Sequence, residues 1–183
     1  EAKPTRDHTE RMLRGFGVEV GVTRGGGQAR TISLVGGQRL SAIEAAIPGD
    51  PSSAAFLIAA GLISPDGDVM VEGVMSNPTR SGFFDMAELM GARLGAEDTD
   101  DAAGERLIDI QSGSAALIGR SVPERLVPAM IDEFPILAVL AAFATGTTIV
   151  TGAEELRVKE TDRVKAVVDM LRANGVEAEE RED

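Results

Sequence analysis

The sequence predicts an α/β (α+β) protein built from repeated units, and three observations lead to this prediction. Apolar residues recur at helical spacing in some segments and alternate at strand spacing in others. The tripeptide Pro-Thr-Arg occurs at residues 4–6 and 78–80, each time beginning thirteen residues before a glycine, Gly17 and Gly91. The composition, with 43% hydrophobic and 26% charged residues among 183, fits a folded globular chain.

The first part of the chain is predicted to contain two helices and four strands. Met12 and Phe16 fall on one side of a helix, and the two alternating segments that follow are joined by a turn at 24–27. Asp50 is an N-cap residue before Pro51 at the first helical position, which predicts a helix start. The predicted elements are helix 10–16, strands 18–22, 31–35 and 42–47, helix 51–63 and strand 69–74.

The second part alternates helices and strands in the same way. Phe83, Met86, Ala87 and Met90 share one helix face at positions i, i+3, i+4 and i+7. The acidic stretch 98–105 contains few apolar residues and is interpreted as a solvated hairpin loop. The predicted elements are helix 83–90, strands 107–110 and 117–122, helix 136–144, strand 147–150 and helix 164–171.

The internal similarity indicates a unit of about 60–80 residues that repeats with insertions. Met12 and Met86 hold the same place in two copies, and Met170, five residues before Gly175, repeats the ending a third time. Each glycine is expected to end a helix in the left-handed conformation and to precede a strand. The first copy begins midway and the last lacks its second hairpin strand, so we expect a fragment of a longer protein.

Composition excludes several classes of function. The formal net charge of −12 argues against binding to a nucleic-acid backbone through the general surface. The absence of cysteine and the single histidine, His8, exclude disulfides, cysteine nucleophiles and thiolate or multi-histidine metal sites. No apolar run reaches the roughly 18 residues of a membrane-spanning helix. We therefore expect a soluble protein of a reducing compartment, with neither nucleic acid nor membrane as a partner.

A local cluster of cations stands out in this acidic chain. Arg157, Lys159, Arg163 and Lys165 lie within nine residues. Lys159 and Arg163, four apart, are predicted to share a face at the start of the last helix, where like charges repel and the helix dipole disfavours cations. A phosphate or carboxylate ligand would offset both effects. Pairing with the acids between residues 154 and 162 is the alternative, and spacing does not choose between them.

Other polar residues have a structural as well as a functional interpretation. Asp132 and Glu133 stand directly before an apolar helix, where acidic side chains can cap the helix N-terminus. The alternative is that one of them is a catalytic carboxylate. His8 is interpreted as a surface or capping histidine. The run Gly25–Gly27 joins two strands and opens no helix, so it is a turn and not a phosphate-binding loop.

Four segments resemble a known family. Residues 154–163, EELRVKETDR, resemble a signature motif of the 5-enolpyruvylshikimate-3-phosphate synthase family. MIDEFP at 130–135, GDPSS at 49–53 and TRDHTE at 5–10 look like three further segments of it, in the same order. The match covers essentially the whole chain and is nearest to the glyphosate-tolerant bacterial branch.

This resemblance implies a two-lobed inside-out α/β barrel in which each lobe has three βαβαββ units and the active site lies between the lobes. Residues 1–47 would complete one lobe, and residues 48–183 would supply about two of the three units of the other. The parent protein would be a cytoplasmic, monomeric enzyme of aromatic amino acid biosynthesis.

The family's reaction transfers the enolpyruvyl group of phosphoenolpyruvate to the 5-hydroxyl of shikimate 3-phosphate and releases phosphate, without a cofactor or metal. By resemblance, Asp132 would bind the shikimate hydroxyls and act as the base toward the 5-hydroxyl. Glu160 would exchange the proton at the methylene carbon, and Lys159 would contact the ring and share in proton transfer. Arg163 would clamp phosphoenolpyruvate, and Arg6 would face the phosphate of shikimate 3-phosphate. How the acid and base roles divide among the first three stays open.

Two other functions also stay open. UDP-N-acetylglucosamine enolpyruvyl transferase moves the same group on the same fold, although residues 157–163 favour the shikimate enzyme. A non-catalytic α/β repeat module that binds partners through its acidic surface is the second alternative. Several of the family's substrate-binding residues lie outside this sequence, so we expect the chain alone to be inactive and to bind shikimate 3-phosphate at most weakly.

Overall fold

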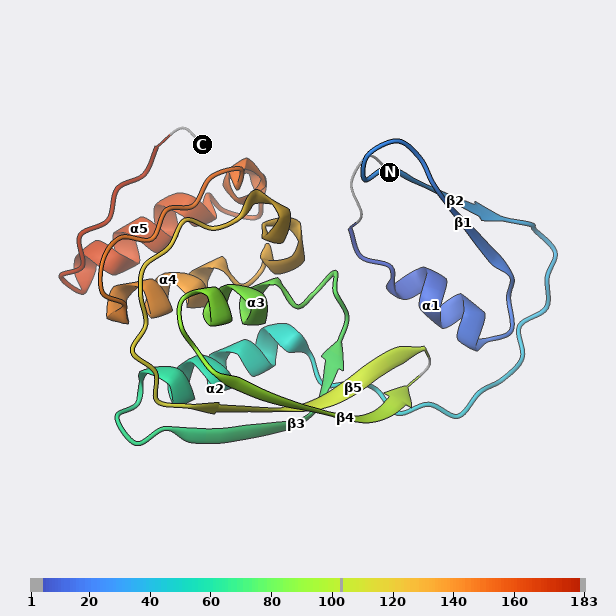
Figure 1. Ribbon diagram of the computed structural model, residues 1–183. Helices are drawn as coiled ribbons and strands as arrows, with labels where there is room; N and C mark the ends of the chain where they lie inside the picture. Colours follow the sequence, from blue (N-terminus) through green and yellow to red (C-terminus); the bar gives the residue numbers. More distant parts are fainter. Residues whose placement is uncertain (1–4, 103, 182–183) are drawn as a thin grey trace.

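Two antiparallel sheets and a set of helices make up residues 5–102 and 104–181, which the computed structural model describes (Figure 1). This confirms the predicted mixture of helices and strands. The α-helices are α1 (His8–Gly15), α2 (Pro51–Ile63), α3 (Gly82–Leu89), α4 (Phe134–Phe143) and α5 (Arg163–Ala173). The strands are β1 (Val20–Arg24), β2 (Arg30–Leu34), β3 (Asp68–Ser76), β4 (Leu94–Ala102) and β5 (Glu105–Gly113). Short 3-10 helices are η1 (Glu124–Leu126), η2 (Pro128–Met130) and η3 (Glu154–Val158).

The larger sheet has the order β3-β5-β4 and carries four of the described α-helices on one of its faces. Helices α2 and α3 lie over this face, and α4 and α5 form a further layer on the same side (Figure 1). Helix α1 and the β1–β2 hairpin stand to one side, beside the tip of the β4–β5 hairpin (Figure 1). No helix in the described part of the chain is long and apolar enough to cross a membrane.

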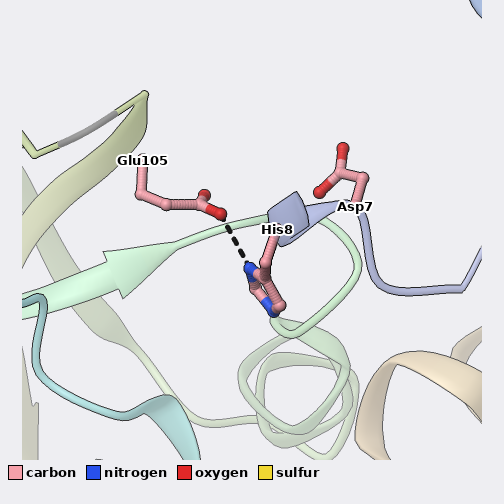
Figure 2. A group of neighbouring side chains, drawn as sticks. All are labelled: Asp7, His8 and Glu105. Carbon is pink, nitrogen blue, oxygen red and sulfur yellow. Dashed lines mark hydrogen bonds and ion pairs between the residues drawn. The ribbon is translucent and has the colours of Figure 1, made fainter. Parts of the chain in front are cut away.

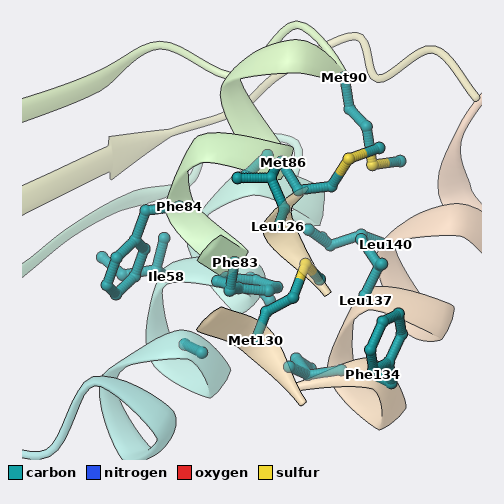
Figure 3. Packing of buried hydrophobic residues seen from close by; sticks show 14 of the residues in the cluster. Ile58, Phe83, Phe84, Met86, Met90, Leu126, Met130, Phe134, Leu137 and Leu140 are labelled. Carbon is teal, nitrogen blue, oxygen red and sulfur yellow. The ribbon is translucent and has the colours of Figure 1, made fainter. Parts of the chain in front are cut away.

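The core fills the space between the sheet and the helices and is rich in methionine (Figure 3). Phe83, Met86, Ala87 and Met90 are all at most 1% exposed, which confirms the predicted buried face of α3. They pack in one cluster with residues of α2, η1, η2 and α4. Burial of apolar surface, at roughly 25 cal/mol per Å², is the main force that holds these layers together.

The internal repeat is confirmed in the backbone. Helices α1 and α3 begin 74 residues apart and have eight residues each, and each is followed by an antiparallel hairpin. Gly17, Gly91 and Gly175 have φ angles of 84°, 106° and 78°, the left-handed conformation expected after a helix. In all three copies the residue after the glycine donates its N–H to a carbonyl five residues earlier. A strand follows the first two glycines, but residues 176–181 form none.

Three predicted strands are not formed. Residues 42–47 have no regular structure, and Ile47 is 90% exposed, because no strand lies beside this apolar segment to pair with it in the described chain. Segments 117–122 and 147–150 make only isolated bridges, Ile118 to Thr145 and Ser121 to Ile149. Alternating apolar residues therefore identified extended chain but not the sustained pairing that makes a strand.

The acidic stretch 98–105 forms the exposed end of a hairpin, as predicted, but most of it is strand and not loop. Residues 98–102 continue β4 and pair with residues 105–108 of β5, two of which, Leu107 and Ile108, are apolar. This pairing overrides the low strand propensity of aspartate. Glu105 begins β5 and is 7% exposed, with partners from α1. The side chain of Asp101 lies outside the described residues, as does Pro4 of the first repeated tripeptide.

Replacement of Gly175 by alanine should lower the free energy of unfolding by about 1 kcal/mol, measured by urea denaturation, because an L side chain is strained at this φ. An added Cβ meets no atom within 4 Å there, so the loss reports backbone conformation alone. The control is Gly36→Ala, which also meets no atom within 4 Å but has no left-handed φ. Equal losses in the two variants would contradict this account.

Candidate functional site

Asp132 lies between two arginines that come from distant parts of the chain. It occupies the turn between η2 and α4, and its carboxylate accepts hydrogen bonds from Arg6 Nη2 and from Arg163 Nη1, the latter at 3.2 Å. Arg6 precedes α1, and Arg163 is the first residue of α5. The structure therefore brings together three of the five residues predicted for the site.

Glu160 extends this group, whereas Lys159 does not join it. Arg163 Nη2 donates to Glu160 Oε2 at 2.8 Å. Lys159 Nζ instead donates to Glu155, and no hydrogen bond or ion pair joins Lys159 to Asp132 in the described structure. Lys159 lies in the segment between η3 and α5 and belongs to neither helix, so the prediction that it shares a helix face with Arg163 is wrong.

All four clustered cations pair with acids of the chain itself, as the second interpretation of the cluster expected. The pairs are Arg157 with Asp162 and Glu180, Lys159 with Glu155, Arg163 with Asp132 and Glu160, and Lys165 with Asp169. Such partly exposed pairs are worth about 0–1 kcal/mol each, so an anionic ligand can compete for them. Intrachain pairing and ligand binding are therefore compatible at these cations.

A second group of charges lies beside the first and was missed by sequence reasoning. Glu133 is 2% exposed and accepts a hydrogen bond from Ser52 Oγ, while Arg80 Nη2 lies 3.9 Å from Glu133 Oε1. The same Arg80 nitrogen donates to Ser52 Oγ at 2.8 Å and to Asp50 Oδ1 at 3.0 Å. The repeated Pro-Thr-Arg tripeptide was the available signal, because Arg80 is the repeat counterpart of Arg6.

The two capping interpretations have opposite outcomes. Asp50 caps α2 as predicted, since its carboxylate accepts from the backbone N–H groups of Ser52 and Ser53. The side chains of Asp132 and Glu133 do not cap α4; they bind arginine and serine side chains instead. The capping interpretation of that pair is therefore wrong.

The pKa values of the two neighbouring acids, Asp132 and Glu133, are shifted in opposite directions. Burial alone would raise the pKa of Asp132, but hydrogen bonds and charges from Arg6 and Arg163 outweigh it and lower that pKa. Burial dominates at Glu133 and raises its pKa, with only partial opposition from Ser52 and Arg80. The pKa of Glu160 is lowered by a hydrogen bond from its own backbone N–H and by Arg163. Asp132 and Glu160 are therefore held as carboxylates.

His8 belongs to a separate group, which Figure 2 shows with Asp7 and Glu105. Its Nδ1 lies 2.7 Å from Glu105 Oε1 and its side chain is 32% exposed, so His8 lies partly at the surface, as one of its two interpretations expected, but it does not cap α1. The three side chains offer ligand atoms within 4.8 Å of one another. The two carboxylates, however, already interact with the guanidinium of Arg11 and the amide of Asn77. This chemistry fits a polar network between segments better than a metal site.

Comparison with known proteins gives a consistent result. The family model described as EPSP synthase (3-phosphoshikimate 1-carboxyvinyltransferase) matches residues 1–183. A 3-phosphoshikimate 1-carboxyvinyltransferase from Hyphomonas neptunium is 72% identical over 183 residues, which are 100% of this chain and 42% of that protein. One from a Methylobacterium species is 53% identical over 96% of this chain and 40% of its own length.

The structural comparison agrees with the sequence comparison. The solved EPSP synthase of Acinetobacter baumannii superimposes with a TM-score of 0.90 at 45% identity and covers 100% of this chain. This match takes up 40% of the Acinetobacter chain. The chain thus spans about two-fifths of the length of the relatives that it matches.

Glu133→Gln should stabilise the protein more at pH about 7.5 than at pH about 4.5, relative to the unchanged protein. Because the pKa of Glu133 is raised on folding, the stability that its protonated form provides in acid is lost as the pH rises through the folded-state pKa. Glutamine does not ionise, so the variant keeps this stability at the higher pH. Urea unfolding at both pH values measures the difference, with the exposed Glu72→Gln as control. The same pH response in both variants would contradict the assignment.

Proposed function

This chain belongs to the EPSP synthase family, and we propose that the complete protein transfers the enolpyruvyl group of phosphoenolpyruvate to the 5-hydroxyl of shikimate 3-phosphate. The observation that carries this proposal is the position of Asp132 between Arg6 and Arg163. The reaction requires a proton-accepting carboxylate beside cations that bind phosphate and carboxylate groups. These three residues provide that combination at one point.

The two arginines would hold one substrate each. Arg6 faces the phosphate of shikimate 3-phosphate, and Arg163 clamps phosphoenolpyruvate through its planar guanidinium. Both already contact the Asp132 carboxylate, so two anions bound to them would come close to that base. Their side chains are 43% and 29% exposed, which leaves guanidinium surface open to a ligand.

Proton transfer would follow from the charge states of the acids. In the addition step, Asp132 takes the proton of the 5-hydroxyl as its oxygen bonds to C2 of phosphoenolpyruvate, and a donor protonates C3. In the elimination step, phosphate leaves and C3 gives up a proton. Asp132 and Glu160 are held ionised by their lowered pKa values and so have a free position for a proton, and each becomes a stronger base once an anionic substrate draws Arg6 or Arg163 away from it. The Lys159 ammonium is the proton donor of the three. Lys159 must then release Glu155, an exposed partner.

We place the two sides of this site in different lobes of the complete protein. Residues 1–47 would complete one lobe and supply Arg6, and residues 48–183 would form about two units of the other and supply Asp132, Lys159, Glu160 and Arg163. The separation of α1 and the β1–β2 hairpin from the larger sheet supports this division (Figure 1).

Asp132→Asn in the complete protein should lower kcat by roughly 10²- to 10⁴-fold, because asparagine keeps the size of the side chain but cannot accept the hydroxyl proton. Phosphate release measures the rate at saturating substrates. The control is Asp169→Asn, which removes an exposed α5 carboxylate bound to Lys165 and should change kcat less than about twofold. Full activity of Asp132→Asn would contradict the proposal.

Ligand-dependent melting separates the two enolpyruvyl transferases. Shikimate 3-phosphate at about 100 times its Kd should stabilise the complete protein by roughly 2.7 kcal/mol, which raises its Tm by several degrees. UDP-N-acetylglucosamine at the same concentration should leave the Tm unchanged. The reverse result would favour the sister enzyme, and no shift with either ligand would favour the non-catalytic module.

A further inference from the structure

Helix α1 is attached to the larger sheet by polar contacts and not by apolar packing. None of its residues is buried, although its counterpart α3 buries five of eight. Outside its own hairpin it packs against the start of β5. The position of α1 matters for the site, because Arg6 lies two residues before its first residue, His8.

Two buried polar side chains receive the start of α1, and together we call them the clasp: Asn77, 1% exposed, and Glu105, 7% exposed. Glu105 Oε1 lies 2.7 Å from His8 Nδ1, and Glu105 Oε2 lies 3.5 Å from Arg11 Nη1. Asn77 Nδ2 donates to Asp7 Oδ1 at 2.7 Å and to Glu105 Oε2 at 3.1 Å. The clasp thus binds three residues at the start of α1 and is itself cross-linked.

The buried carboxylate of the clasp depends on residues of α1 for its ionic partners. A buried carboxylate is unfavourable unless it is paired, and among its described partners Glu105 has His8 and Arg11, both from α1. The contacts also set the orientation of the chain, since Asp7 and His8 are consecutive and bind different members of the clasp. Arg6 directly precedes Asp7 in the chain, so it has little freedom to move away from Asp132.

We propose that Asn77 and Glu105 are positioning residues that hold Arg6 opposite Asp132. Neither touches a substrate, and both act through the backbone at the start of α1. This inference rests on the proposed function, in which Arg6 binds the phosphate of shikimate 3-phosphate. In that function residues 1–47 and 48–183 belong to different lobes, so the clasp also joins the lobes where both substrates meet.

The kinetic test is a double-mutant cycle in the complete protein. Glu105→Gln keeps the size of the side chain and removes its charge, and it should raise the KM for shikimate 3-phosphate about 5- to 20-fold with kcat within about threefold. In an Arg6→Ala background the same change should raise KM less than about twofold, because its target is gone. The control is Asp98→Asn, which breaks the exposed pair with Arg106 in the same hairpin and should leave KM unchanged.

A structural measurement tests the clasp without catalysis. Spin labels are attached at Thr9→Cys on α1 and Glu88→Cys on α3, two exposed positions, in a variant of the complete protein without other cysteines. Pulsed electron paramagnetic resonance then measures the distance between the two helices. Glu105→Gln should widen the distance distribution, and Asp98→Asn should not.

The outcomes separate the two proposals. An unchanged distance distribution in Glu105→Gln overturns the clasp, and so does an increase in KM of the same size in the Arg6→Ala background, which would indicate general destabilisation. If Arg6→Ala alone leaves KM unchanged, the proposed role of Arg6 fails, while a widened distribution still supports the clasp.

Discussion

The ion pairs that converge on Asp132 are the constraint on which the site depends. In a chain with a formal charge of −12, every cation has many possible carboxylate partners, so the pairs that do form are informative about the site. Arg6 and Arg163 meet the same carboxylate, so two cations stay close together without strong repulsion. The two arginines are therefore already close together, but their charges are partly neutralised by the carboxylate of Asp132. In the proposed function, an anionic substrate would compete with Asp132 for the arginines and would thereby free the carboxylate to accept a proton.

The repeat shows how one local pattern serves different purposes. Helices α1 and α3 have the same length and the same glycine-terminated end, yet only α3 lies in the core. The arginines that precede them differ in the same way. Arg80 is turned toward the buried Glu133, whereas Arg6 reaches the half-exposed Asp132. The repeated unit thus supplies a buried support on one side and an accessible cation on the other.

Features encoded by neighbouring residues were predictable from the sequence, and features that depend on distant partners were not. The N-cap Asp50, the buried face of α3 and the left-handed Gly91 depend on residues within a turn or two of them. The missing strand at 42–47 and the buried Glu105 depend on what lies beside them in space. The pairing of Arg6 with Asp132 spans 126 residues, and only the family resemblance pointed to both.

Sulfur in this chain comes from methionine alone, and its distribution has a consequence for chemical ageing. Met86, Met90 and Met130 are 0% exposed in the core, whereas Met12 and Met70 are 47% and 58% exposed. Oxidants therefore reach the surface thioethers first, and the sulfoxides formed there remain in contact with solvent and outside the core. Oxidation of Met86, Met90 or Met130 requires the core to open, and a polar sulfoxide in the core would then hinder the helices and the sheet from packing together again.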